Sequence, residues 1–479
     1  MNIADRQLAI WLSLLTFATY AYFHAGGGWN QNSQFDLTRA IVERHTFAIE
    51  GYARNTGDVS THAGHVYSNK SPGLSIIGAV PYAMLHALEK DPDDPLTLAL
   101  NHYVCTILIV ALLGALVPAF LYRIGRDHGL SATWSATVAI AVGLATQLLP
   151  YATFFTIAVP SGALMLVALT AERPALGGFA AGLAAMMNYL CAPAVLLIGL
   201  IRPRKTTFFG GAAPPLIAVA IYQKICFGSF FRTSISTLDA RFRSTNAAFG
   251  VFQRPSLEAF YGITVSPYRG LFYFAPVLIA AIGGFILWFR SRQERGTLAA
   301  IVGISALFFL VNVSFNGWEA GFGIGARYLV PLIPLWGMAM LHLRGWLRPF
   351  FAVLAVISFA FNFAAVAVDP QPSGTIPRPL TQYIFPLLAR GQFSPNVPIT
   401  PPWSAATFTG HTSVNRMTHD EAIVFERHPP ESDASEWASF NLGEPFFGPG
   451  DARSLIPIAL VILAGLAAVG TKARSIRQS

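Results

Sequence analysis

Residues 98–129 read LALNHYVCTILIVALLGALVPAFLYRIGRDHG, an apolar run that ends in a basic turn. The run from 98 to 122 is long enough to cross a bilayer, since a transmembrane helix needs about 20 mostly apolar residues. The turn after it carries Arg123 and Arg126, and short basic loops favour the cytoplasmic side of a membrane. This stretch therefore predicts both a transmembrane helix and its orientation.

The composition of the whole chain agrees with this pattern. Its 479 residues are 53% hydrophobic and 12% charged, with a mean hydropathy of +0.50, whereas soluble domains carry about 25% charged residues. We therefore predict an all-α polytopic membrane protein. The net charge of +8 is accounted for by basic loops, so it is poor evidence for nucleic-acid binding. The first apolar run, 7–23, lacks a small-residue cleavage site in the expected place and is interpreted as a retained helix.

Five basic loops determine the predicted topology when all of them are placed in the cytoplasm. They begin at Arg123, Arg202, Arg290, Leu343 and Lys472. The bundle then has about 11–13 transmembrane helices, at 7–23, 98–122, 131–149, 156–171, 175–187, 190–201, 207–226, 271–289, 297–315, 328–343, 349–368 and 454–470. One further apolar run, 72–88, would reverse the parity if it crossed the membrane. We place it on the outer face as an interfacial helix, with an ordinary span as the alternative.

This topology divides the chain into three parts. Residues 1–368 form a transmembrane module with outer loops at 25–97 and 227–270, and a short third outer segment runs from 315 to 327. Residues 369–453 form an irregular, proline-rich outer segment, and 454–479 supply the last helix and a cytoplasmic tail. No internal repeat is evident.

The outer side carries cations where the topological bias disfavours them. Lys70, Arg269 and Arg327 all lie there, close to helix ends. Phosphate is a natural ligand for such groups, because lysine offers a compact charge and arginine a bidentate fork. Solvated positions at the lipid headgroups are the alternative for each of them.

Two acids in the first outer loop are candidates for proton transfer. Asp36 is expected in the first turn of a helix capped by Asn32 or Ser33, and Asp58 follows a Thr-Gly turn. Either could deprotonate a hydroxyl nucleophile, and either could simply stabilise its local turn. In the third outer segment, Glu319 and Arg327 bracket three glycines, which permit close approach of backbone to ligand or a tight helix–helix turn.

One set of motifs resembles a known superfamily. A first span is followed by a long outer loop with an early acid, and then by YSNKSPG at 67–73, an aromatic–x–x–Lys–x–Pro element that opens an interfacial helix. With SPYRGLFYFAPV at 266–277 and GARYLVPLIPL at 325–335, this pattern is similar to the GT-C membrane glycosyltransferases. It looks most like the lipid A aminoarabinose transferases, the protein O-mannosyltransferases and an uncharacterised bacterial branch of relatives. The resemblance covers most of residues 1–345.

The resemblance implies transfer of a sugar from a polyprenyl-phosphate carrier to a glycan, lipid or protein acceptor, at the outer face of a bacterial inner membrane. It implies an aspartate base, Asp36 or Asp58, and a donor phosphate held by Lys70. Arg327 and Arg269, as cations on the outer side, are expected as further phosphate ligands. Asn32, Tyr67, Glu319 and Tyr328 are the expected substrate-binding residues. The Asp-Glu pair usual after the first span falls near Gln31 and Asn32 here, and the next outer loop has no acid. We therefore expect no metal and no cofactor.

A transporter or flippase of a lipid-linked sugar is the alternative function. Such a protein would favour inverted repeats and buried charges inside its spans. In this sequence the polar groups collect at one face, which favours the enzyme.

Overall fold

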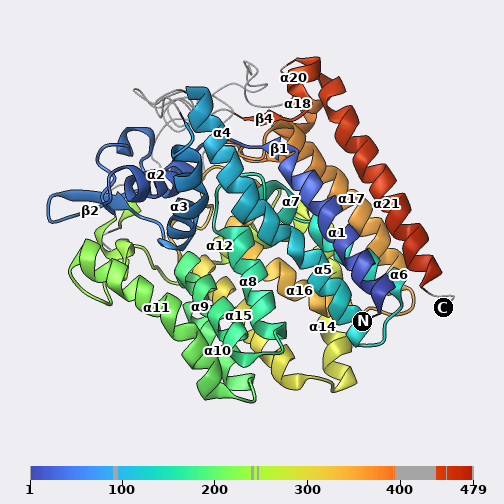
Figure 1. Ribbon diagram of the computed structural model, residues 1–479. Coiled ribbons are helices and arrows are strands. Elements are labelled where there is room, and N and C mark those ends of the chain that lie inside the picture. The colour runs from blue at the N-terminus through green and yellow to red at the C-terminus, as the bar shows by residue number, and fades with distance from the viewer. Residues whose placement is uncertain are drawn as a thin grey trace.

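The computed structural model describes residues 2–89, 95–238, 242–244, 247–374, 376–391, 393, 439–448 and 450–476. The chain is an all-α bundle with very little sheet, as predicted (Figure 1). Five described helices are long and apolar enough to cross a membrane: Thr97–Asp127, Lys205–Phe227, Arg295–Ser314, Leu347–Val368 and Ala452–Ser475. The protein is therefore a multi-pass membrane protein.

Helices lie at all twelve predicted spans, although seven of them are shorter or more polar than those five. The helices are α1 (Ile3–Ala21), α4–η2–α5 (Pro95–Cys105, Thr106–Ala111, Leu112–Asp127), α6 (Ala132–Leu144), α8 (Ala158–Thr170), α9 (Pro174–Met187), α10 (Ala192–Ile201), α11 (Lys205–Phe227), α14 (Ile279–Ser291), α15 (Arg295–Ser314), η7–α16 (Arg327–Leu332, Ile333–Met340), α17 (Leu347–Val368) and α21 (Ile456–Ser475). Short elements join them: α7 (Leu148–Tyr151), η3 (Tyr189–Cys191), η4 (Ser234–Thr237), α12 (Leu257–Thr264), α13 (Leu271–Phe274) and η6 (Pro276–Leu278).

Small residues let the helices pack closely. A Cβ at Gly178 of α9 would lie 1.8 Å from the Phe208 carbonyl oxygen of α11, and one at Gly211 of α11 would lie 2.1 Å from the Ala175 oxygen of α9. Small residues at such contacts are the usual means by which membrane helices bring their backbones together.

The predicted basic loops lie at one end of the bundle, which agrees with the parity derived from the sequence. Arg126 pairs with Asp5 at 2.8 Å, and Lys472 donates to Gln7 at 2.6 Å. His128 lies 3.3 Å from Glu294, and its ring is 6.2 Å from that of His342. Arg202 donates to the carbonyl oxygens of Leu169 and Ala171. Figure 1 shows both chain termini at this end.

The opposite end is built by the first outer loop. It contains α2 (Trp29–Glu43), η1 (Ala53–Asn55), a hairpin of β2 (Val59–His62) and β3 (His65–Ser68), and α3 (Gly73–His86). The strands pair with Val59 opposite Ser68, across a two-residue turn in which Ala63 and Gly64 have φ of 50° and 84°. The helix expected at 72–88 is present as α3, and its location at the membrane interface stays a prediction.

One detail of the first loop differs from the prediction. Helix α2 begins at Trp29 with Gly28 as its N-cap, a full turn before the expected caps. Asp36 therefore lies in the middle of the helix, fully buried, and the expectation that it occupies the first turn is wrong. A tryptophan, an asparagine and a glutamine occupy the first turn, so this helix start lacks the usual polar cap signal.

The described ends of the last outer segment are attached to the first loop. After α17 the chain runs along this loop, and Gln371 donates to the Ala25 carbonyl at 3.0 Å before η8 (Leu380–Ile384) and α18 (Phe385–Ala389). β4 (Phe440–Asn441) pairs antiparallel with β1 (Phe23–His24), ahead of α20 (Glu444–Phe447) and η11 (Ala452–Leu455). Residues 394–438 of the predicted irregular segment lie outside the described residues.

Candidate active site

A cavity of about 440 Å³ lies where the outer segments meet. Its lining comes from α2, the residues that flank the β2–β3 hairpin, the start of α8, η3, η4 and the segment after it, the end of α15, the glycine-rich turn before η7, and the segment after α17. Most lining side chains are apolar, and the charged ones are few: Asp58, Lys70, Glu319 and Arg327. A large apolar cavity with a few convergent polar groups is the usual form of a ligand site.

Lys70 and Asp58 form an ion pair in this cavity. The lysine Nζ lies 2.8 Å from Asp58 Oδ2, and the Asn69 amide donates to Asp58 Oδ1 at 3.1 Å. The two residues are twelve positions apart but flank the β2–β3 hairpin, whose register brings its two ends together. Their side chains are 18% and 13% exposed, so the pair is shielded from bulk water without being sealed off.

Neighbouring cations and an amide control the charge of Asp58. Burial on its own would raise the pKa of this carboxyl, but Lys70, Asn69 and Arg327 outweigh burial and hold the pKa below its ordinary value. Asp58 is therefore ionised at neutral pH.

Arg327 opens η7 and lines the same cavity. Its guanidinium carbon lies 5.5 Å from the centre of the Tyr328 ring, and its Nη1 is 3.5 Å from the Phe322 carbonyl. Tyr328 and Glu319 also line the cavity, so five of the predicted site residues come together here.

The glycine-rich turn that positions Arg327 requires its glycines. Gly323 and Gly325 have φ of 142° and 62°, and a Cβ at Gly325 would lie 2.5 Å from Gln147 Nε2. Arg269, 1% exposed, donates to the carbonyl oxygens of Gly321 and Gly323. The structure thus places Arg269 against the turn, outside the cavity lining, where it supports the segment that ends at Arg327.

Three more predicted residues lie outside the lining. Asp36 is buried behind it and accepts a hydrogen bond from Asn55 at 3.3 Å. Asn32 donates to the Asn55 carbonyl at 3.0 Å and accepts from the Gly28 N–H, so it stabilises the start of α2. Tyr67 packs its ring 5.4 Å from that of Phe227 in a separate hydrophobic cluster.

The cavity also contains residues that the sequence analysis did not select. Gln31 of α2 donates to Gln371 at 2.5 Å, which joins the first and last outer segments across 340 positions. Aromatic side chains of distant segments complete the wall, among them Trp29, Phe242, Phe252 and Phe315. The run of polar residues at 30–34, near the start of an outer helix, could have identified Gln31 as a site residue, whereas nothing in the local sequence identifies Gln371.

The metal-free expectation remains a prediction. Within the described part of the chain, no group of three or more His, Cys, Asp or Glu side chains is arranged to hold a metal ion. The three cysteines, Cys105, Cys191 and Cys226, are buried and unpaired by disulfides.

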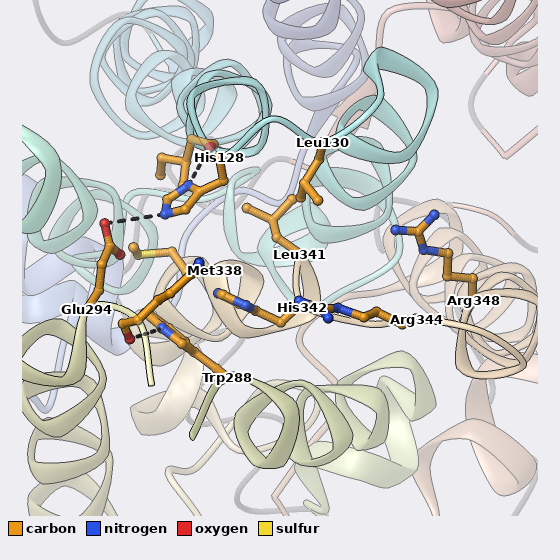
Figure 2. Close-up of a pocket in the computed structure, with 11 residues that line it drawn as sticks. His128, Leu130, Trp288, Glu294, Met338, Leu341, His342, Arg344 and Arg348 are labelled. Atoms are coloured by element: carbon orange, nitrogen blue, oxygen red, sulfur yellow. Dashed lines mark hydrogen bonds and ion pairs between the residues drawn. The ribbon is translucent and has the colours of Figure 1, made fainter. Parts of the chain in front are cut away.

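A second, smaller cavity of about 60 Å³ lies at the end where the basic loops meet. Figure 2 shows its lining, with His128 beside Glu294 and with His342 next to Trp288, whose rings stack at 4.7 Å. The hydrogen bond with Glu294 raises the pKa of His128 and lowers that of Glu294. No residue predicted for the site lines this cavity, and it is much too small for a lipid-linked sugar.

Comparisons with known proteins add one finding. No protein-family model matches the chain, and no curated protein matches it. Among solved structures, an oligosaccharyltransferase of Archaeoglobus fulgidus with a tethered acceptor peptide aligns at 11% identity and a TM-score of 0.41. The alignment covers 82% of this chain and 57% of that one, so the chain spans little more than half of its length. At this level of similarity the match assigns neither a family nor an activity.

Proposed function

We propose that the protein is a membrane glycosyltransferase that moves a sugar from a polyprenyl-phosphate carrier to an acceptor hydroxyl at the outer end of the bundle. The observation that carries the proposal is the Asp58–Lys70 pair inside a large, mostly apolar cavity. The apolar lining suits a lipid chain, the cations suit its phosphate, and the carboxylate suits a proton acceptor. The resemblance of the YSNKSPG element to GT-C enzymes supports the same assignment.

In the proposed reaction, Asp58 takes the proton of the acceptor hydroxyl as the oxygen attacks the anomeric carbon. The bond between that carbon and the phosphate oxygen breaks, and polyprenyl phosphate leaves with the electron pair. Lys70 and Arg327 stabilise the negative charge on the departing phosphate, since such donors are most effective where charge develops.

Because Asp58 and Lys70 form an ion pair, donor binding would also change the basicity of Asp58. A phosphate that binds Lys70 competes with Asp58 for the same ammonium group. Because Lys70 is one of the groups that lower the pKa of Asp58, this competition returns the carboxylate toward its ordinary basicity. Donor binding would then prepare the base.

Binding of farnesyl phosphate, a short polyprenyl phosphate, tests the phosphate site. Lys70→Ala should weaken its binding about tenfold to a hundredfold, because a hydrogen bond between charged groups contributes about 1.5–3 kcal/mol. Lys224→Ala is the matched control: this lysine lies in the last turn of α11 on the same predicted side, is exposed, and donates to the Gly228 carbonyl. Equal affinity of folded Lys70→Ala and wild type would refute the phosphate site. Binding of a farnesyl phosphate that carries a sugar, without any transfer of that sugar, would favour the transporter.

A further inference from the structure

Asn312 is a polar residue in the lining of the cavity. It lies near the outer end of α15, two residues before the helix ends, and it is 2% exposed. Its neighbours Val311, Phe315 and Asn316 line the cavity with it. A buried amide in such surroundings requires hydrogen-bond partners.

Within the described residues, those partners are missing. Neither Nδ2 nor Oδ1 of Asn312 has a hydrogen-bond partner there, although both atoms are buried. Leaving both the donor and the acceptor of an amide unsatisfied destabilises a folded protein, and an apolar residue of similar shape would avoid that penalty. The Asn312 amide therefore lowers the folding stability of the protein without bound ligand.

Asn362 of α17 shows what a structural asparagine looks like in the same bundle. It is fully buried too, but its Nδ2 donates to the carbonyl oxygens of Phe274 and Ser358, both at 2.8 Å. Asn362 joins α17 to the α13 segment and does not line the cavity. The two asparagines differ at Nδ2, which has internal partners in Asn362 and none in Asn312, while Oδ1 has no partner in either residue. Only Asn312 belongs to the cavity lining.

We infer that Asn312 is a specificity-determining residue that hydrogen-bonds the sugar of the donor. This inference rests on the proposed function and extends it to the neutral part of the substrate. An uncharged amide does little for a phosphate and nothing for a prenyl chain, whereas a sugar hydroxyl both donates and accepts, as the amide does. The charged groups at Asp58, Lys70 and Arg327 would hold the phosphate and the proton, and Asn312 would select the sugar.

The test compares wild type, Asn312→Leu and Asn362→Leu as full-length protein in detergent. The unfolding temperature is measured without ligand and then during titration with farnesyl phosphate, or with farnesyl phosphate carrying glucose, mannose, galactose or arabinose. We expect Asn312→Leu to unfold at the wild-type temperature or above it, and Asn362→Leu to unfold below it. Asn312→Leu should bind farnesyl phosphate normally but bind the preferred sugar conjugate roughly threefold to tenfold more weakly.

The outcomes separate this inference from the proposed function. If Asn312→Leu loses stability as Asn362→Leu does, or binds every conjugate as tightly as wild type, the inference is wrong while the glycosyltransferase proposal stands. If no farnesyl compound binds to wild type, the proposed donor class is wrong, and the sugar-binding role of Asn312 is wrong with it.

Discussion

At the scale of single residues, the two candidate bases are now distinguished by their surroundings. Asp58 lines the cavity beside Lys70, whereas Asp36 is buried in α2 behind the lining. We expect Asp58→Asn to reduce turnover about a hundredfold to ten-thousandfold with donor binding retained, as loss of a general base does. Asp36→Asn should chiefly lower the unfolding temperature. Turnover of purified variants with matched donor-binding curves decides this, and the reverse result would move the base to Asp36.

The residue scale also shows what the sequence could and could not provide. Lys70 was recognisable because a lysine on the translocated side of a membrane is unusual and lies in a distinctive motif. Asp58 was recognisable as an acid, but its pairing with Lys70 depends on the hairpin register. Gln371 and Asn312 gave no local signal: the first joins Gln31 from 340 positions away, and the second is one polar residue in an apolar helix. Their roles exist only after the fold has brought distant segments together.

At the scale of elements, the glycine-rich turn before η7 provides a test of how Arg327 is positioned. Arg269 donates to the carbonyls of Gly321 and Gly323, and Arg269→Met would leave the buried Gly323 oxygen and the partly buried Gly321 oxygen without these donors. Such losses cost about 1–3 kcal/mol for each group, so the unfolding temperature should fall by several degrees. Arg254→Met is the control, an exposed outer arginine. If Arg269→Met retains its stability and loses only affinity for farnesyl phosphate, the sequence-based assignment of Arg269 as a phosphate ligand is correct.

Helix positions were the most predictable elements and helix starts the least. A helix lies at every predicted span, because the prediction rests on hydropathy averaged over long apolar runs and on the basic loops between them. The start of α2 was missed because Gly28 and Trp29 give no side-chain cap, so the polar residues after them were taken for the boundary. Asp36 was placed in the first turn for the same reason.

At the scale of the whole molecule, the structure shows that the predicted basic loops share one end, and which end faces the cytoplasm stays a prediction. Figure 1 shows the termini at that end and α18 and α20 at the other. The sequence predicted this parity because five basic loops agree on it, and that agreement decided the placement of 72–88 outside the bilayer. Packing of the last outer segment on the first was beyond prediction, since β1 and β4 are two-residue strands separated by more than 400 positions.

Labelling of single cysteines in intact cells tests the orientation. Thr61 in β2 and Phe231 after α11 are exposed at the end that holds the candidate site, while Thr206 and Gln293 are exposed at the basic end. The native cysteines are at most 1% exposed, so their background reaction should be low. A membrane-impermeant maleimide should label Thr61→Cys and Phe231→Cys in intact cells, and should label Thr206→Cys and Gln293→Cys only after the membrane is opened. The opposite pattern would place the cavity on the cytoplasmic side of the membrane. The arginines of the basic loops would then lie on the outer side, against the positive-inside bias that oriented the predicted helices.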